Sequence, residues 1–101
     1  MSRAFVNEDA EPDPSARFRL PGRDDPGYDE AATRALIQGA NEGDSFSAEI
    51  ATGYRFGEPR LVPHVRLMLE RAIAESNDRL EQLARRFLRR AGVVDEEDEE
   101  G

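Results

Sequence analysis

The sequence predicts an all-α protein, with about four short helices in two stacked helical hairpins. Apolar residues recur at the i, i+3, i+4, i+7 spacing of a helix between residues 28 and 92. Glycine-rich and proline-rich breaks divide that region into four segments. Residues 1–27 contain four prolines, and residues 93–101 contain six acids and no base. We therefore expect an extended or disordered arm, a helical domain over 28–92 and a disordered acidic tail.

The first two predicted helices form one hairpin. Asp29 is expected to be the N-cap of the first, which ends near Asn41. The second begins at Asp44 or Ser45 and is closed by the breaks at residues 57–59. Their apolar residues have helical spacing: Ala32, Ala35, Leu36 and Ala40 in the first, then Phe46, Ile50, Gly53 and Tyr54 in the second. Because amphipathic helices fold against one another, we expect these stripes to pack together.

The third and fourth predicted helices form the other hairpin. The third begins near Pro63, which suits a first turn because its missing N–H is not needed there. In the fourth, Asp78 is expected to cap the helix with Glu81 reaching back, and Gly92 supplies a left-handed stop. Apolar stripes follow in both: Val65, Met68, Leu69, Ala72 and Ile73, then Leu80, Leu83, Ala84, Phe87, Leu88 and Ala91.

Composition excludes several classes of protein. The chain has 101 residues, no cysteine, one histidine and a formal net charge of −8. Without cysteine there is no disulfide framework, thiolate metal site or cysteine nucleophile, and His64 has no second histidine with which to bind a metal. No phosphate-binding glycine loop or nucleophile elbow occurs. We therefore expect a protein that is not an enzyme and has no cofactor. Without a long apolar run or a signal peptide, we expect no membrane contact and a cytoplasmic location.

Arginine concentrates in the second half of the helical region. Residues 59–92 hold eight arginines against four acids, a local charge of +4 in an acidic molecule. The arginines predicted to contact a partner lie on the fourth helix: Arg79, Arg85, Arg86, Arg89 and Arg90. They either form a solvated helix face or bind an acidic protein partner. Nucleic acid is not expected, because the whole chain is negative and the acidic tail competes for the same guanidinium groups.

Aromatic residues supply further candidate contacts with a protein partner. Tyr54, Arg55 and Phe56 follow one another, so the arginine can stack or clasp a carboxylate, or the two rings belong to the core. In the arm, Phe5 and Phe18 dock on a partner or on the chain's own helices, unless the arm is a disordered leader. A folded part of this size has a small core, which self-association into a homo-oligomer would help to stabilise.

Residues 35–91 resemble two HEAT-like helical repeats. Residues 36–54 and 68–87 can be aligned with each other, with apolar positions matched on both sides of a polar turn. The linking turn holds Gly57, Pro59, Arg60, Val62 and Pro63 in the order found in bacterial HEAT-like repeats. The resemblance implies a protein that binds protein partners through the surface of its stacked helices.

The leader, residues 1–9, resembles that of some bacterial transcript-cleavage factors of the Gre class. Gly43-Asp44 and Ala48-Glu49 are similar to the tip of the Gre hairpin, but Ser47 occupies the place of the second carboxylate of that tip. This resemblance implies a setting near RNA polymerase without metal-assisted RNA cleavage. The sequence therefore predicts a small non-enzymatic interaction module or adaptor, with a transcription-linked regulator associated with RNA polymerase as the alternative.

Overall fold

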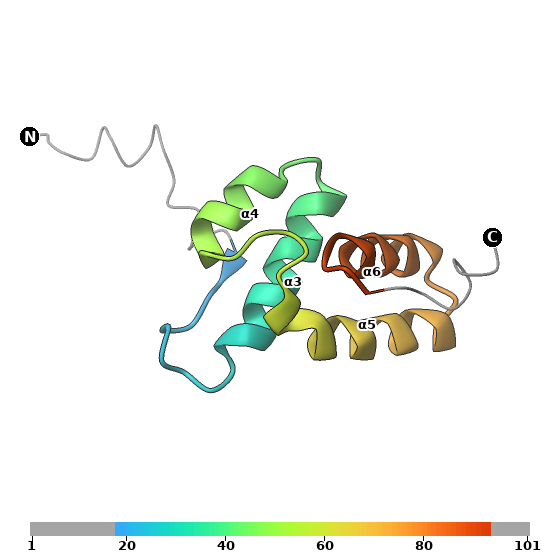
Figure 1. The fold of residues 1–101 in the computed structure, drawn as a ribbon, viewed down its shortest axis with the longest axis horizontal. Coiled ribbons are helices and arrows are strands. Elements are labelled where there is room, and N and C mark those ends of the chain that lie inside the picture. Colours follow the sequence, from blue (N-terminus) through green and yellow to red (C-terminus); the bar gives the residue numbers. More distant parts are fainter. Residues whose placement is uncertain (1–17, 94–101) are drawn as a thin grey trace, which may run out of the picture.

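The computed structural model describes residues 18–93 and shows an all-helical protein (Figure 1). The predicted fold class is confirmed. The arm before residue 18 and the tail after residue 93 lie outside the described residues, so the order predicted for them stays a prediction. The elements in chain order are α3 (Tyr28–Asn41), α4 (Ser45–Thr52), the 3-10 turn η1 (Pro59–Leu61), α5 (Val62–Ala74) and α6 (Asp78–Arg90).

Two helical hairpins make up the fold, and α3 joins them. Helix α4 packs against α3, and α6 packs against α5. Helix α3 also contacts α5, α6 and η1, so it crosses the second hairpin while carrying α4 on its other side (Figure 1). The two hairpins are therefore stacked through one central helix.

The core lies where α3 meets the second hairpin. Leu36 of α3, Leu61 of η1, Val65 of α5 and Phe87 of α6 are all fully buried there. Phe56 meets Phe87 in an edge-to-face contact with ring centroids 4.9 Å apart, an arrangement that the aromatic quadrupoles favour. The apolar stripe predicted for the fourth helix is confirmed as the inward face of α6.

The helix starts agree with the sequence in α4 and α5 but not in α3 and α6. The Asp44 carboxylate accepts the Ser47 N–H at 3.2 Å, and Pro63 lies in the first turn of α5. Helix α3 instead begins at Tyr28 after Gly27, which makes no side-chain cap, so the prediction of Asp29 as N-cap was wrong. There Asp29 is a first-turn residue.

The cap of α6 is also one residue earlier than predicted. The Asn77 side chain accepts the Leu80 N–H at 3.1 Å, whereas Asp78 is already within the helix. Glu81 makes an ion pair with Arg85 at 3.0 Å and does not reach back to a cap. Gly92 has φ +89°, which confirms the predicted left-handed stop.

Helix α4 also ends earlier than predicted. Its last residue is Thr52, with Gly53 as its left-handed C-cap, so Tyr54 lies beyond the helix and packs against the core.

Two residues of the apolar stripe predicted for the second helix, Phe46 and Ile50, face outward, which corrects the expectation that they pack inward. Phe46 is 70% exposed and Ile50 is 57% exposed. Instead, α4 turns Ala48 and Thr52 toward α3, and both are fully buried. The reason is close approach: a Cβ on Gly39 would lie only 2.7 Å from the Ala48 Cβ. Only small side chains fit between two helices that are this close.

Residues 18–27 are part of the folded unit. Phe18 is only 7% exposed and belongs to the core cluster, where Leu20 packs against it. The Arg23 guanidinium lies 5.6 Å from the Tyr28 ring centroid, close enough for a cation–π contact. Of the two roles predicted for the arm, docking on the chain's own helices is what Phe18 does. Its burial leaves little of its side chain for a partner.

Candidate functional site

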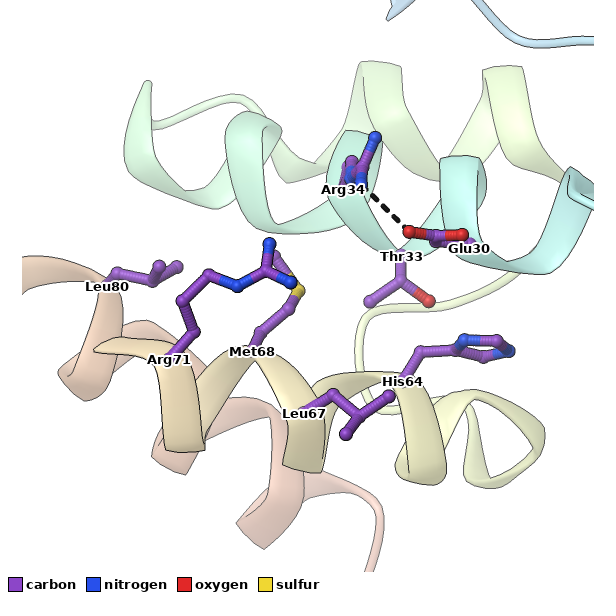
Figure 2. Close-up of a pocket in the computed structure, with 8 residues that line it drawn as sticks. All are labelled: Glu30, Thr33, Arg34, His64, Leu67, Met68, Arg71 and Leu80. Atoms are coloured by element: carbon purple, nitrogen blue, oxygen red, sulfur yellow. Dashed lines mark hydrogen bonds and ion pairs between the residues drawn. The ribbon is translucent and has the colours of Figure 1, made fainter. Parts of the chain in front are cut away.

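A groove runs between α3 and α5 on one face of the molecule (Figure 2). Its cavity has a volume of about 290 Å³. Helix α3 forms one wall, α5 forms the other, and a leucine of α6 closes one end. Figure 2 shows Met68 and Arg71 pointing from α5 toward α3. The lining residues are Glu30, Thr33 and Arg34 of α3, His64, Leu67, Met68 and Arg71 of α5, and Leu80 of α6.

A second cavity of about 410 Å³ continues the groove along α3 toward its C-terminal end. Arg34 and Leu80 line both cavities, so the two are contiguous. Here the opposite wall is the start of α6 instead of α5. The other residues that line it are Ile37, Gln38 and Asn41 of α3, and Asn77, Arg79 and Leu83 near the start of α6. The two cavities together are called the α3 groove below.

Helical periodicity explains why these residues share the groove. On α3, Glu30, Arg34 and Ile37 are separated by four and three residues and therefore lie along one side of the helix. On α5, His64, Leu67 and Arg71 are related in the same way. From Glu30 to Asn41 the groove follows eleven residues of α3, or about 16 Å at the rise of an α-helix. It is therefore long enough for about three turns of a docked helix.

The apolar floor of the groove is incompletely covered. On α5, Val65 and Ala72 face the core and are fully buried. Leu67 lies on the groove side and is 62% exposed, and Met68 beside it is half-buried. In a concave site these two side chains offer apolar area that a bound molecule would cover.

Cationic side chains surround this floor. Arg34 pairs with Glu30 at 2.8 Å, but both side chains are more than half exposed, so the pair contributes little to stability. The Arg79 Nε donates to the Asn41 Oδ1 at 2.8 Å, which joins the start of α6 to the end of α3. The Arg71 backbone carbonyl accepts the Glu75 N–H, but its guanidinium makes no hydrogen bond or ion pair with another residue of the range 18–93. Three guanidinium groups against one carboxylate make the groove locally positive.

The arginines predicted as one cluster are divided by the structure. Arg79 lies in the α3 groove, whereas Arg85 makes its ion pair with Glu81 and is partly buried. Arg86, Arg89 and Arg90 are exposed on α6 outside the groove. The five guanidinium groups therefore do not all line the same cavity. Only Arg79 joins the groove arginines.

The aromatic candidates are mostly structural. Phe56 is buried in the core, and the Tyr54 hydroxyl donates to the Asp29 Oδ1 at 2.7 Å. The Arg60 Nη1 donates to the same hydroxyl at 3.4 Å, and this hydrogen bond, with the charges of Tyr54 and Asp29, raises the pKa of Arg60 above its ordinary value. Arg55 is exposed. The remaining candidate, Phe5, lies outside the described residues.

The residues similar to the Gre tip take part in bonds within the chain. Asp44 caps α4, as described above, and a Glu49 carboxylate oxygen accepts the Phe56 N–H at 2.9 Å. Within residues 18–93, no group of three or more His, Asp or Glu side chains is placed to hold a metal ion. In the same range, every helix is too short or too polar to cross a membrane.

Sequence reasoning missed Arg34, Leu67 and Arg71 as site residues. The sequence places Arg34 and Arg71 on different helices about 37 residues apart, and only the crossing of α3 over α5 brings them to one groove. Comparison with protein-family models, with curated proteins and with solved structures finds no match to this chain. Function is therefore inferred from the geometry and charge of the α3 groove.

Proposed function

We propose that this protein is a small non-enzymatic interaction module that binds an acidic amphipathic helix of a protein partner in the α3 groove. The observation that carries the proposal is the exposure of Leu67 in the same groove as Arg34 and Arg71, 62% of its surface being open to solvent. Helix-in-groove binding of this kind uses apolar anchors at positions i, i+3 or i+4, and i+7 of the docked helix. The length of the groove along α3 accommodates that spacing.

The apolar floor supplies most of the affinity in this proposal. Covering a leucine side chain completely contributes about 1.5–3 kcal/mol, and the half-buried Met68 and Leu80 add further area. Both walls are helices that are held by their own core contacts. Binding therefore costs little reorganisation of the module itself.

The arginines supply selectivity. Each exposed ion pair contributes only about 0.2–1 kcal/mol, so Arg34, Arg71 and Arg79 do not hold a partner by themselves. Their common sign nevertheless favours carboxylates and disfavours a basic helix, which sets the choice and orientation of the partner. The partner is therefore an acidic helix and not simply an apolar one.

A selection of displayed random peptides tests this function and requires no candidate partner. The full chain is used to select from a library of peptides of about 12 residues, a length that covers the groove. We expect enrichment of Asp and Glu together with Leu, Ile or Phe at helical spacing. Leu67→Ser is expected to weaken binding of a selected peptide about tenfold, equivalent to about 1.4 kcal/mol.

Charge reversal at two arginines of α5 distinguishes an effect of the groove from an effect of net charge. Arg71→Glu is expected to abolish the preference for acidic peptides, whereas the matched control Arg66→Glu changes the same charge at an exposed α5 residue outside the groove lining. Equal loss in both variants would show that only the net charge matters. Selected peptides that bind Leu67→Ser as tightly as the parent chain would contradict the proposal.

Deletion of the acidic tail provides a second test of the α3 groove. Residues 95–100 carry six carboxylates on the same chain as the groove, so they compete with an acidic peptide at high effective concentration. Deleting residues 94–101 is expected to tighten peptide binding at low salt and to have less effect at high salt. Strong, salt-sensitive DNA binding by the truncated chain would instead favour a nucleic acid as partner.

A transcription-linked regulator is the second candidate function, and it depends on the Gre-like leader. Residues 1–9 carry that resemblance and lie outside the described residues. Purified RNA polymerase retained by the full chain, and lost after deletion of residues 1–9, would support this candidate. Retention that requires Leu67 but not the leader would place polymerase among the partners of the α3 groove.

A further inference from the structure

Helix α4 carries an apolar pair that no described residue covers. Phe46 and Ile50 are four residues apart, so they lie next to each other on one side of the helix, and both are more than half exposed. Helix α4 packs mainly on α3, and its other side faces away from the second hairpin (Figure 1). This pair is called the α4 face below.

The α4 face is apolar and without charge. The single charged residue of α4 is Glu49, and its carboxylate is engaged by the Phe56 N–H. An acidic or basic occupant therefore gains nothing here from ion pairing. The occupant that fits is a short apolar segment.

The chain enters the described fold beside this helix. Phe18 belongs to the same core cluster as Ala48 and Ala51 of α4, and the Arg23 guanidinium lies against Gly53 at its C-terminal end. The Tyr28 hydroxyl donates to the Thr52 carbonyl oxygen at 2.7 Å. Figure 1 shows this first described segment beginning near the end of α4 and then running away from it to the start of α3. Residues 1–17 therefore connect to the fold near the C-terminal end of α4, the helix that carries the α4 face.

The sequence before Phe18 contains one pair of large apolar side chains after Met1. Between Ser2 and Arg17 only Phe5 and Val6 are large and apolar; the rest are small, polar, charged or proline. Eleven residues separate Val6 from Phe18, and in extended form they span up to about 36–40 Å. Helix α4 is only about 12 Å long, so Phe5 and Val6 reach every part of it.

We infer that Phe5 and Val6 pack against Phe46 and Ile50, so that the leader folds back over α4. A contact this small suffices because it is intramolecular, and the entropic cost of closing a loop grows only with the logarithm of its length. A dimer through the same face would bury far less than the roughly 800 Å² per partner of a stable interface. The leader is therefore a better occupant than a second copy.

A spin-label experiment tests the contact in the full chain. Because the chain has no cysteine, Ala4→Cys provides a single attachment site for a nitroxide next to Phe5. We expect loss of NMR peak intensity at the amides of residues 45–53, with the amides of α5 and α6 retaining theirs. No loss, or loss spread over all helices, would overturn the inference.

Two double variants show whether the apolar side chains make the contact. A mixture of spin-labelled and isotope-labelled chains shows whether the contact is within one chain or between two. Phe5→Ser with Val6→Ser, or Phe46→Ser with Ile50→Ser, is expected to restore the intensity at α4. Each pair removes apolar groups outside the described core, so the fold is retained. Persistent loss in both variants would contradict the inference. Loss transferred from a spin-labelled to a separate isotope-labelled chain would show that a second copy covers the face instead.

Discussion

Helices α4 and α6 both carry large apolar side chains at helical spacing, but α6 buries them and α4 exposes them. Helix α6 turns Leu83, Phe87 and Leu88 into the core, where all three are buried. Helix α4 buries only Ala48 and Thr52 and leaves its two largest apolar side chains outside. The periodicity of a sequence thus shows that a helix has an apolar side. The distance to the neighbouring helix decides whether that side fits against it.

Truncating one phenylalanine on each helix tests this comparison with the largest expected change in the free energy of unfolding. Phe87→Ala leaves a cavity in the core and removes the contact with Phe56, so we expect a loss of about 3–5 kcal/mol in the free energy of unfolding. Phe46→Ala leaves the core intact and removes only the contact inferred with the leader, so we expect a much smaller loss of at most about 1 kcal/mol. Urea denaturation measures both. Equal losses would show that α4 is buried in solution.

The close approach of α3 and α4 gives the next largest effect. In Gly39→Ala the new Cβ would lie 2.7 Å from the Ala48 Cβ and 2.9 Å from the Asp44 carbonyl oxygen. We expect a net loss of about 1–3 kcal/mol in the free energy of unfolding from overpacking, although alanine favours a helix interior.

The double variant Gly39→Ala with Ala48→Gly sharpens this prediction. It removes one of the two clashes, so its stability should exceed the value expected from adding the two single effects. Purely additive free energies of unfolding would show that the two helices do not meet at this point.

A hydrogen bond between the start of α3 and the end of α4 gives the smallest effect. Tyr28→Phe removes the donor to the buried Thr52 carbonyl oxygen, and we expect a loss of about 1 kcal/mol by thermal or urea unfolding. Tyr54→Phe is the matched control, because its bond to Asp29 is only part-buried and water replaces it. A larger loss of stability in Tyr54→Phe than in Tyr28→Phe would show that the Tyr54 hydrogen bond is the more stabilising one.

Some candidate binding residues were predicted from the sequence pattern, and others became apparent only from their position in the fold. Arg79 was predicted from the charge of the fourth helix, and it lies in the α3 groove. Leu67 and Arg71 were not predicted, because a leucine and an arginine on an amphipathic helix have no distinguishing sequence signal. Phe18 was predicted as a candidate contact with a protein partner. It lies in the core instead, because the segment before α3 packs against the helices.

The sequence by itself determined the class of fold and the number of helices, because helical periodicity, proline and glycine act over a few residues; several helix ends, such as the end of α4 at Thr52, differ from those predicted. It also determined that α6 has one strongly apolar side. Only the tertiary structure decided that α4 presents Phe46 and Ile50 to the outside and that α3 and α5 enclose a groove lined by arginines. Both depend on how closely two helices approach, and that distance is set by residues of different helices, such as Gly39 of α3 and Ala48 of α4.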